Sequence, residues 1–256
     1  MAWDEIVREV TPYVVKIDTP SGHGTGFLCF YNEDKGLCGI ATARHVVSHA
    51  DTWQQPIRIN HFHSKAQVFL KEELRYIDLD EDTDSAAIIF PTGSLPNLPA
   101  NPLPLLPVET RLPIGADVGW LGYPGIAAYT LCFFSGIISA PTPHGYLIDG
   151  VAINGVSGGP VIAVADGKIQ VVGTISAYAP NRATGDTLPG LSVAQDISHF
   201  HDSIIKLKSL DEANKRKRAE AQERERAAPE VVPPEPSEGP ADIGAVPATA
   251  RRSRAR

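Results

Sequence analysis

The sequence lacks several features of membrane and secreted proteins. It has no run of 18 apolar residues, so no segment predicts a transmembrane helix. The N-terminal segment has no basic stretch followed by an apolar one, so we expect no secretory signal. The three cysteines are too few for a disulfide framework. We therefore predict a cytoplasmic protein in which Cys29, Cys38 and Cys132 are free thiols, although Cys29 and Cys38 could also face each other across a turn.

Positive charge is also scarce in this chain. The 23 Lys and Arg residues are outnumbered by 30 Asp and Glu, and the net charge of -7 argues against general affinity for nucleic acid. The remaining composition, 43% hydrophobic and 21% charged, is that of a globular protein. The length of 256 residues allows one or two domains, each with a core of its own. We predict neither a nucleic-acid nor a membrane partner, and the oligomeric state stays open.

Short apolar runs dominate the chain before residue 210. Runs such as "YVVKI", "GFLCF", "AAIIF" and "IQVVGTIS" are separated by Gly, Pro, Asn and Asp. Runs of this length, rich in Val, Ile and Phe, predict an all-β barrel or sandwich. The Pro-rich stretch "FPTGSLPNLPANPLPLLPVET" predicts a connector between two β units, because proline cannot donate a hydrogen bond within a central strand.

Helical patterns are confined to two short stretches before residue 210. A short helix is predicted around residues 3–10. A second begins near Ser198, a predicted N-cap, and has Phe200, Ile204 and Leu207 at the spacing of one buried helix face. We therefore expect the second helix to have one buried face.

The chain after residue 210 has no pattern of a core. Residues 211–228 are highly charged, with opposite charges four residues apart, and predict a solvated helical extension. A coil that binds a protein partner is the alternative. Residues 229–256 are predicted to be a disordered, Pro-rich tail with a basic end.

Two His-x-His pairs are candidate metal ligands. His61 and His63 form one pair, and His199 and His201 form the other. Neither pair has a third ligand or a cysteine cluster nearby, so we predict no metal site and no cofactor.

The stretch "INGVSGGPVI" presents Ser157 among three glycines and a proline. A serine hydroxyl attacks a carbonyl group only if a base takes its proton and a third group orients that base. His45 closes the stretch "GLCGIATARHVV", and Asp84 opens the strand pattern "DSAAIIF". Asp80 and Asp82 are nearby competitors, but only Asp84 is followed directly by the strand. This order, with "GTGF" upstream, resembles trypsin-like serine proteases, above all the high-temperature-requirement (Deg) family.

The resemblance implies a serine endopeptidase that acts on proteins or peptides through an acyl-enzyme intermediate. In this interpretation Ser157 is the nucleophile, His45 is the general base and Asp84 orients the imidazole. The backbone N–H groups of Gly155 and Ser157 would bind the oxyanion.

The resemblance also implies a chymotrypsin-like fold of two six-stranded antiparallel β-barrels with a short C-terminal helix. Deg proteases usually carry a PDZ domain after the protease domain, but this chain has a charged segment and a Pro-rich segment there, so we expect no PDZ domain. The implied boundaries are a protease domain at 1–210, a first barrel at about 10–95, a connector at about 96–112, a second barrel at about 113–197 and the helix at about 198–210. The charged extension and the tail described above complete the chain.

The substrate pocket is the least specific part of the resemblance. The implied lining residues are Val151, Ser176, Ala177, Tyr178, Gly190 and Ser192. Val151 stands where enzymes that cut after Lys or Arg carry an acid, although Asp149 is close by. We therefore expect a preference for small or medium apolar side chains. The alternative is that these residues only fill the core of the second barrel.

Two other functions compete with the protease hypothesis. A catalytically silent trypsin-like scaffold or peptide-binding module could keep the same three residues. The letters "GVSGG" also fit the nucleophile elbow of an α/β-hydrolase, with Asp186 and His199 as partners. The sequence after Ser157 predicts a hairpin and not a helix, which argues against the hydrolase. Arg44, a bulky cation beside His45, is a departure from the family that could lower the pKa of the base.

Overall fold

The computed structural model describes residues 1–165, 167–180 and 187–227, so the predicted tail at 229–256 lies outside the described part. Two compact units divide the chain at Met1–Lys215 and Arg216–Arg256, and the candidate site lies in the first. The helices are α1 (Trp3–Val10), α2 (Arg44–Thr52) and α3 (Ser198–Ala227). None of these described helices is both long enough and apolar enough to cross a bilayer.

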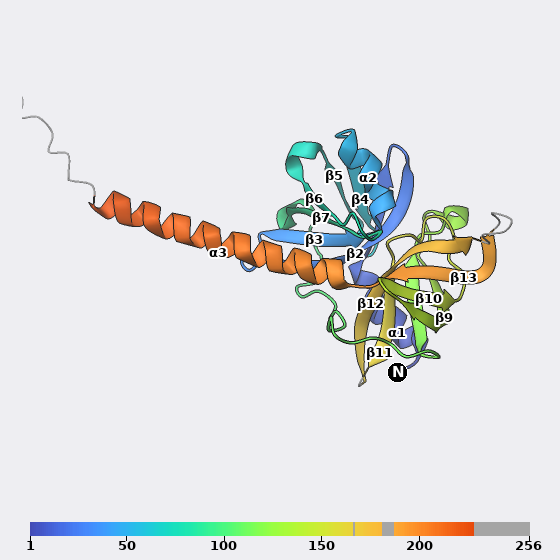
Figure 1. Cartoon of the computed structure of the whole chain (residues 1–256). Coiled ribbons are helices and arrows are strands. Elements are labelled where there is room, and N and C mark those ends of the chain that lie inside the picture. The colour runs from blue at the N-terminus through green and yellow to red at the C-terminus, as the bar shows by residue number, and fades with distance from the viewer. Residues whose placement is uncertain (166, 181–186, 228–256) are drawn as a thin grey trace, which may run out of the picture. The chain divides into compact units, whose positions relative to one another are not determined.

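Seven strands form the first sheet, which is blue to teal in Figure 1. They are β1 (Val14–Thr19), β2 (Gly22–Tyr31), β3 (Leu37–Thr42), β4 (Ile57–His61), β5 (Ala66–Leu70), β6 (Tyr76–Leu79) and β7 (Ala86–Pro91). The order is β5-β4-β1-β2-β3-β7-β6, and each pair is antiparallel. The chymotrypsin-like fold is confirmed, but this half is a seven-stranded sheet with β5 and β6 at its ends instead of a closed barrel of six strands.

Six strands close the second barrel, green to orange in Figure 1, as predicted. They are β8 (Asp117–Gly122), β9 (Cys132–Thr142), β10 (Gly145–Asp149), β11 (Pro160–Ala165), β12 (Lys168–Pro180) and β13 (Thr187–Gln195). Their order around the barrel is β10-β13-β12-β11-β8-β9. The Pro-rich segment contacts this barrel through an isolated bridge between Leu105 and Val171.

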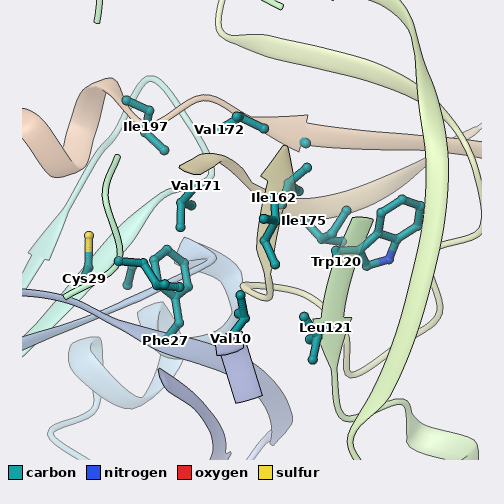
Figure 2. Close-up of a cluster of buried hydrophobic side chains, with 14 of the residues drawn as sticks. Val10, Phe27, Cys29, Trp120, Leu121, Ile162, Val171, Val172, Ile175 and Ile197 are labelled. Atoms are coloured by element: carbon teal, nitrogen blue, oxygen red, sulfur yellow. The ribbon is translucent and has the colours of Figure 1, made fainter. Parts of the chain in front are cut away.

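Strand β2 is shared between two hydrophobic cores, because its side chains alternate between the faces of the sheet. Phe27 and Cys29 pack with residues of the second barrel, as Figure 2 shows, whereas Leu28 belongs to the core inside the first sheet. The larger core joins the first sheet to the second barrel.

Cys29, Cys38 and Cys132 are free thiols, which confirms that prediction. Burial raises the pKa of the Cys38 thiol to about 12 and raises the pKa of Cys29 as well. Both groups are therefore uncharged thiols at neutral pH and act as small apolar residues of the core.

Helix α2 is an element that the sequence pattern does not predict. The stretch "ATARHVV" was expected to be a strand that leads into His45, but β3 ends at Thr42 and His45 lies in the first turn of α2. The helix buries Val46, Val47 and Ala50 against the first sheet.

Helix α3 begins at the predicted place and continues through the charged segment. Phe200 and Leu207 are buried and Ile204 packs on the core, so the predicted helix face is confirmed. Ser198 is not the N-cap but the first helical residue, and its N–H donates to Asp196 Oδ1 at 3.0 Å. The predicted helix and its charged extension form a single element of 30 residues.

Candidate active site

His45 and Asp84 are brought together by the pairing of two neighbouring strands. Strand β3 ends just before His45 and β7 begins just after Asp84, with Thr42 opposite Ala86. The Asp84 carboxylate contacts His45 twice: Oδ2 lies 2.7 Å from the imidazole Nδ1, and Oδ1 accepts the backbone N–H at 2.9 Å. Since Nδ1–H donates to the carboxylate, the Nε2 atom of a neutral imidazole is left as a proton acceptor.

Asp84 also binds the second barrel through a residue that the sequence placed in the substrate pocket. The Ser176 hydroxyl donates to Asp84 Oδ2 at 2.6 Å. Burial tends to raise the pKa of Asp84, but the hydrogen bonds from His45 and Ser176 outweigh it and hold the pKa below its usual value. Asp84 is therefore a carboxylate at neutral pH, with its charge directed at the imidazole.

Ser157 lies across a cavity from this pair. His45 and Ser157 both line a cavity of about 260 Å³. Among the described residues, the partner of the Ser157 hydroxyl is the carbonyl oxygen of Ser176, at 3.3 Å. The Ser157 hydroxyl is therefore directed at this carbonyl and not at His45.

The backbone around Ser157 needs glycine at two positions. Gly155 has φ of +95° and Gly158 has φ of +84°, a region that L residues with side chains rarely adopt. A Cβ atom at Gly158 would lie 2.2 Å from the carbonyl oxygen of Thr25. No described residue accepts a hydrogen bond from the N–H groups of Gly155 and Ser157. These two donors therefore have no acceptor within the described part of the chain, and Ser157 lines the cavity.

The predicted pocket residues fall into two groups. Ser176 and Ala177 line the cavity, whereas Val151 is 53% exposed and lies outside the lining. Ser192 is buried and holds the loop at residues 150–152 in place. Its hydroxyl donates to Gly150 O at 2.7 Å and accepts the Ala152 N–H at 2.8 Å.

Gly190 also holds this loop, because its carbonyl accepts the Gly150 N–H at 2.7 Å. The Tyr178 backbone pairs with Ser192, but its side chain lies outside the described residues. The cavity has four further lining residues that the sequence reasoning missed: Ala152, Ile153, Asn154 and Ile175. Ala152, Ile153 and Asn154 are consecutive and lead into the glycine-rich loop that carries Ser157, which is the signal that could have identified them.

The histidine pairs make structural contacts. His61 Nε2 lies 2.8 Å from the carbonyl of Pro12, and His199 Nε2 lies 3.1 Å from that of Asp78. The described part of the chain contains no group of three side chains placed to bind a metal. Asp186, the acid of the alternative hydrolase triad, lies outside that part.

Comparisons with known proteins agree with this fold. No curated protein sequence matches the chain. Among solved structures, an inactive serine-to-alanine mutant of Rv3671c from M. tuberculosis H37Rv has a TM-score of 0.56 at 21% identity, covering 80% of this chain and 90% of that one. A second structure, the Rv3671c protease in an inactive form, has a TM-score of 0.54 at 22% identity, covering 79% and 92%. The model of the trypsin-like peptidase domain matches residues 24–173, more than half of the chain. The chain therefore belongs to the trypsin-like peptidase family.

Proposed function

We propose that the chain is a serine endopeptidase of the Deg type, with His45, Asp84 and Ser157 as its catalytic residues. One observation carries the proposal: a histidine that is hydrogen-bonded to a half-buried carboxylate shares a cavity with a serine on a glycine-rich loop. A base, its orienting acid and a nucleophile are the three groups that acyl transfer by serine requires.

The chemistry follows from the atoms that face the cavity. Ser157 Oγ attacks the scissile carbonyl carbon, and its proton passes to His45 Nε2. The C–N bond breaks when His45 returns that proton to the leaving amine, and a water molecule then hydrolyses the ester by the same route. Asp84 stabilises the imidazolium, while the N–H groups of Gly155 and Ser157 bind the negative oxygen.

The cavity suits a small or medium apolar side chain. Its lining is apolar at Ala152, Ile153 and Ala177, and its volume of about 260 Å³ is modest. No described lining residue is an acid, so nothing there compensates the charge of a lysine or arginine side chain. We therefore propose cleavage of proteins or peptides after residues such as alanine and valine.

Labelling with a fluorophosphonate probe tests the proposal directly. Wild type should become labelled at Ser157, whereas Ser157→Ala should remain unlabelled and His45→Ala should react far more slowly. A folded wild-type chain that stays unlabelled would contradict the endopeptidase and favour the silent scaffold. The hydrogen bond from Ser157 to Ser176 is the feature that such a scaffold would keep.

A further inference from the structure

The peptide unit that joins Asn154 to Gly155 is held in one orientation by a neighbouring loop. The N–H of Gly125, the first residue of the short 3-10 helix Gly125–Ala127, donates to the carbonyl oxygen of Asn154 at 2.7 Å. The described chain has no cis peptide bonds, and the C=O and N–H of a trans peptide point in opposite directions. The Gly155 N–H therefore points away from Gly125, while the Asn154 carbonyl is kept out of the cavity that Asn154 lines.

The buried side chain of Thr25 holds the following peptide unit, which joins Gly155 to Val156. This residue of β2 is fully buried, and its hydroxyl donates to the carbonyl of Gly155 at 2.8 Å while it accepts the N–H of Tyr123 at 3.0 Å. Its own N–H donates to the carbonyl of Ser157 at 2.8 Å. Thr25 thus binds two carbonyl groups of the nucleophile loop and connects them to the start of the Gly125 loop.

The space around Gly155 leaves this backbone little freedom. A Cβ atom on Gly155 would lie 2.5 Å from His23 Nε2 and 2.5 Å from the carbonyl oxygen of Tyr123. Because the α-carbon is enclosed between these two elements, the peptide units on its two sides are the parts that can rotate. The hydrogen bonds of Gly125 and Thr25 fix both of them.

We propose that the Thr25 hydroxyl and the Gly125 N–H are positioning groups that keep the oxyanion donors facing the cavity. The proposal rests on the proposed endopeptidase function. Loss of either group lets a carbonyl oxygen turn toward the site where negative charge develops. The oxyanion bond exists only in the transition state, so this loss lowers kcat and leaves KM nearly unchanged.

The Gly125 amide is tested by a pair of variants that differ only in the N–H. Gly125→Pro removes the donor and places a ring carbon against the Asn154 carbonyl, yet proline is accepted at the first position of a helix. Gly125→Ala keeps the donor, and its Cβ would meet that oxygen at an ordinary 3.4 Å. We expect kcat for a peptide substrate to fall about 10- to 100-fold in Gly125→Pro and less than about threefold in Gly125→Ala.

The Thr25 hydroxyl is tested in the same way. Thr25→Val keeps the shape of the side chain and removes the hydroxyl, whereas Thr25→Ser restores the hydroxyl. We expect kcat to fall about tenfold or more in Thr25→Val, with KM within about threefold, and to recover in Thr25→Ser. Equal kcat values for Thr25→Val and Thr25→Ser in folded protein would overturn the proposal.

A readout without catalysis separates this proposal from the proposed function. In a Ser157→Ala background, NMR should show slow amide hydrogen exchange at Gly125, and Thr25→Val should accelerate it about tenfold or more. Suppose that exchange at Gly125 changes in Thr25→Val, but wild type hydrolyses no peptide and does not react with fluorophosphonate. The proposed endopeptidase function would then be wrong, while the positioning of the loop by Thr25 would be supported. If wild type is active and neither exchange nor kcat responds to Thr25→Val, the positioning role is wrong.

Discussion

Asp84 shows how opposing effects on one carboxyl group give a pH dependence. Burial raises its pKa, but hydrogen bonds from His45 and Ser176 lower it further, so the folded pKa lies below the unfolded value of about 4. A depressed folded pKa contributes stability that is present above the unfolded pKa and is lost as pH falls through the folded one.

We expect Ser176→Ala to weaken this effect. In this variant the pKa of the Asp84 carboxyl group should rise toward its unfolded value. The variant should therefore have a lower Tm than wild type at pH 7. The difference should shrink as pH falls below about 4, because the Asp84 carboxylate becomes protonated in both proteins. Ser85→Ala is the matched control, since the Ser85 hydroxyl is buried and has no hydrogen-bond partner among the described residues. A Tm difference for Ser176→Ala that does not vary with pH would contradict the prediction.

Among the described glycines with positive φ, Gly158 has the most crowded surroundings for a side chain. In Gly158→Ala the positive φ is strained, and the new Cβ would also meet Thr25 O at 2.2 Å and Thr42 Oγ1 at 2.3 Å. The control is Gly115→Ala, which has φ of +85° but no atom within 4 Å of the added Cβ. We expect urea unfolding to show a loss of about 1–2 kcal/mol for Gly115→Ala and clearly more for Gly158→Ala. Equal losses would show that the crowding near Thr25 carries no cost.

The candidate residues could be predicted because their local patterns are specific. Ser157 was found from its glycines, and His45 from the apolar stretch before it. The bond from Ser176 to Asp84 could not be predicted, because 92 residues separate the two and only the folded barrels bring them together. The orientation of the Ser157 hydroxyl is likewise set by a distant carbonyl.

At the scale of elements, helix α3 is attached to strand β6 through a buried carboxylate. Asp78 accepts hydrogen bonds from Ser203 Oγ at 2.7 Å and from Lys206 Nζ at 3.1 Å. The Ser203 hydroxyl is buried, whereas the Lys206 side chain is 61% exposed. The Ser203 hydroxyl cannot bind water in place of Asp78, whereas the exposed Lys206 ammonium group can.

We expect Asp78→Ala to destabilise the protein by about 1–3 kcal/mol, because it leaves the Ser203 hydroxyl buried without an acceptor. Lys206→Ala should cost less than Asp78→Ala, because the Lys206 side chain is 61% exposed and the Asp78 carboxylate keeps its hydrogen bond from Ser203. Urea unfolding at pH 7 measures both. If the two substitutions cost the same, the attachment of α3 depends on the ion pair and not on the buried hydroxyl.

Two elements escaped the sequence patterns for physical reasons. Strand β4 carries the exposed Arg58 and the half-buried Asn60 between buried residues, so its letters "IRINH" form no apolar run. Helix α2 starts two residues after the apolar strand β3 ends, and its nine residues give too little periodicity to be recognised. These omissions explain why the first half has more elements than expected.

At the scale of the whole molecule, the packed part of the chain ends within α3. Phe200 is fully buried with its ring 6.2 Å from that of Phe27, and Lys215 Nζ lies 2.6 Å from Glu33 Oε1. The first compact unit ends at Lys215. The part of α3 up to Lys215 therefore belongs to the first unit, whereas the composition placed the end of the folded domain at residue 210.

A chain shortened to residues 1–215 should therefore unfold at the same Tm as the full chain, within about 2 °C. A chain shortened to residues 1–197 should lose the buried face of α3 and unfold at a much lower temperature. Differential scanning calorimetry compares the three proteins. A large drop in Tm for 1–215 would show that residues after Lys215 stabilise the first unit.

The division of the candidate catalytic groups between the two halves also sets when activity can arise during synthesis. His45 and Asp84 leave the ribosome with the first sheet, whereas Ser157 and Ser176 come with the second barrel, which closes only when β13 pairs with β10 and β12. A partly made chain therefore holds the proposed base without the proposed nucleophile. The proposed cleavage requires the strands that complete the second barrel, which are the last to be made.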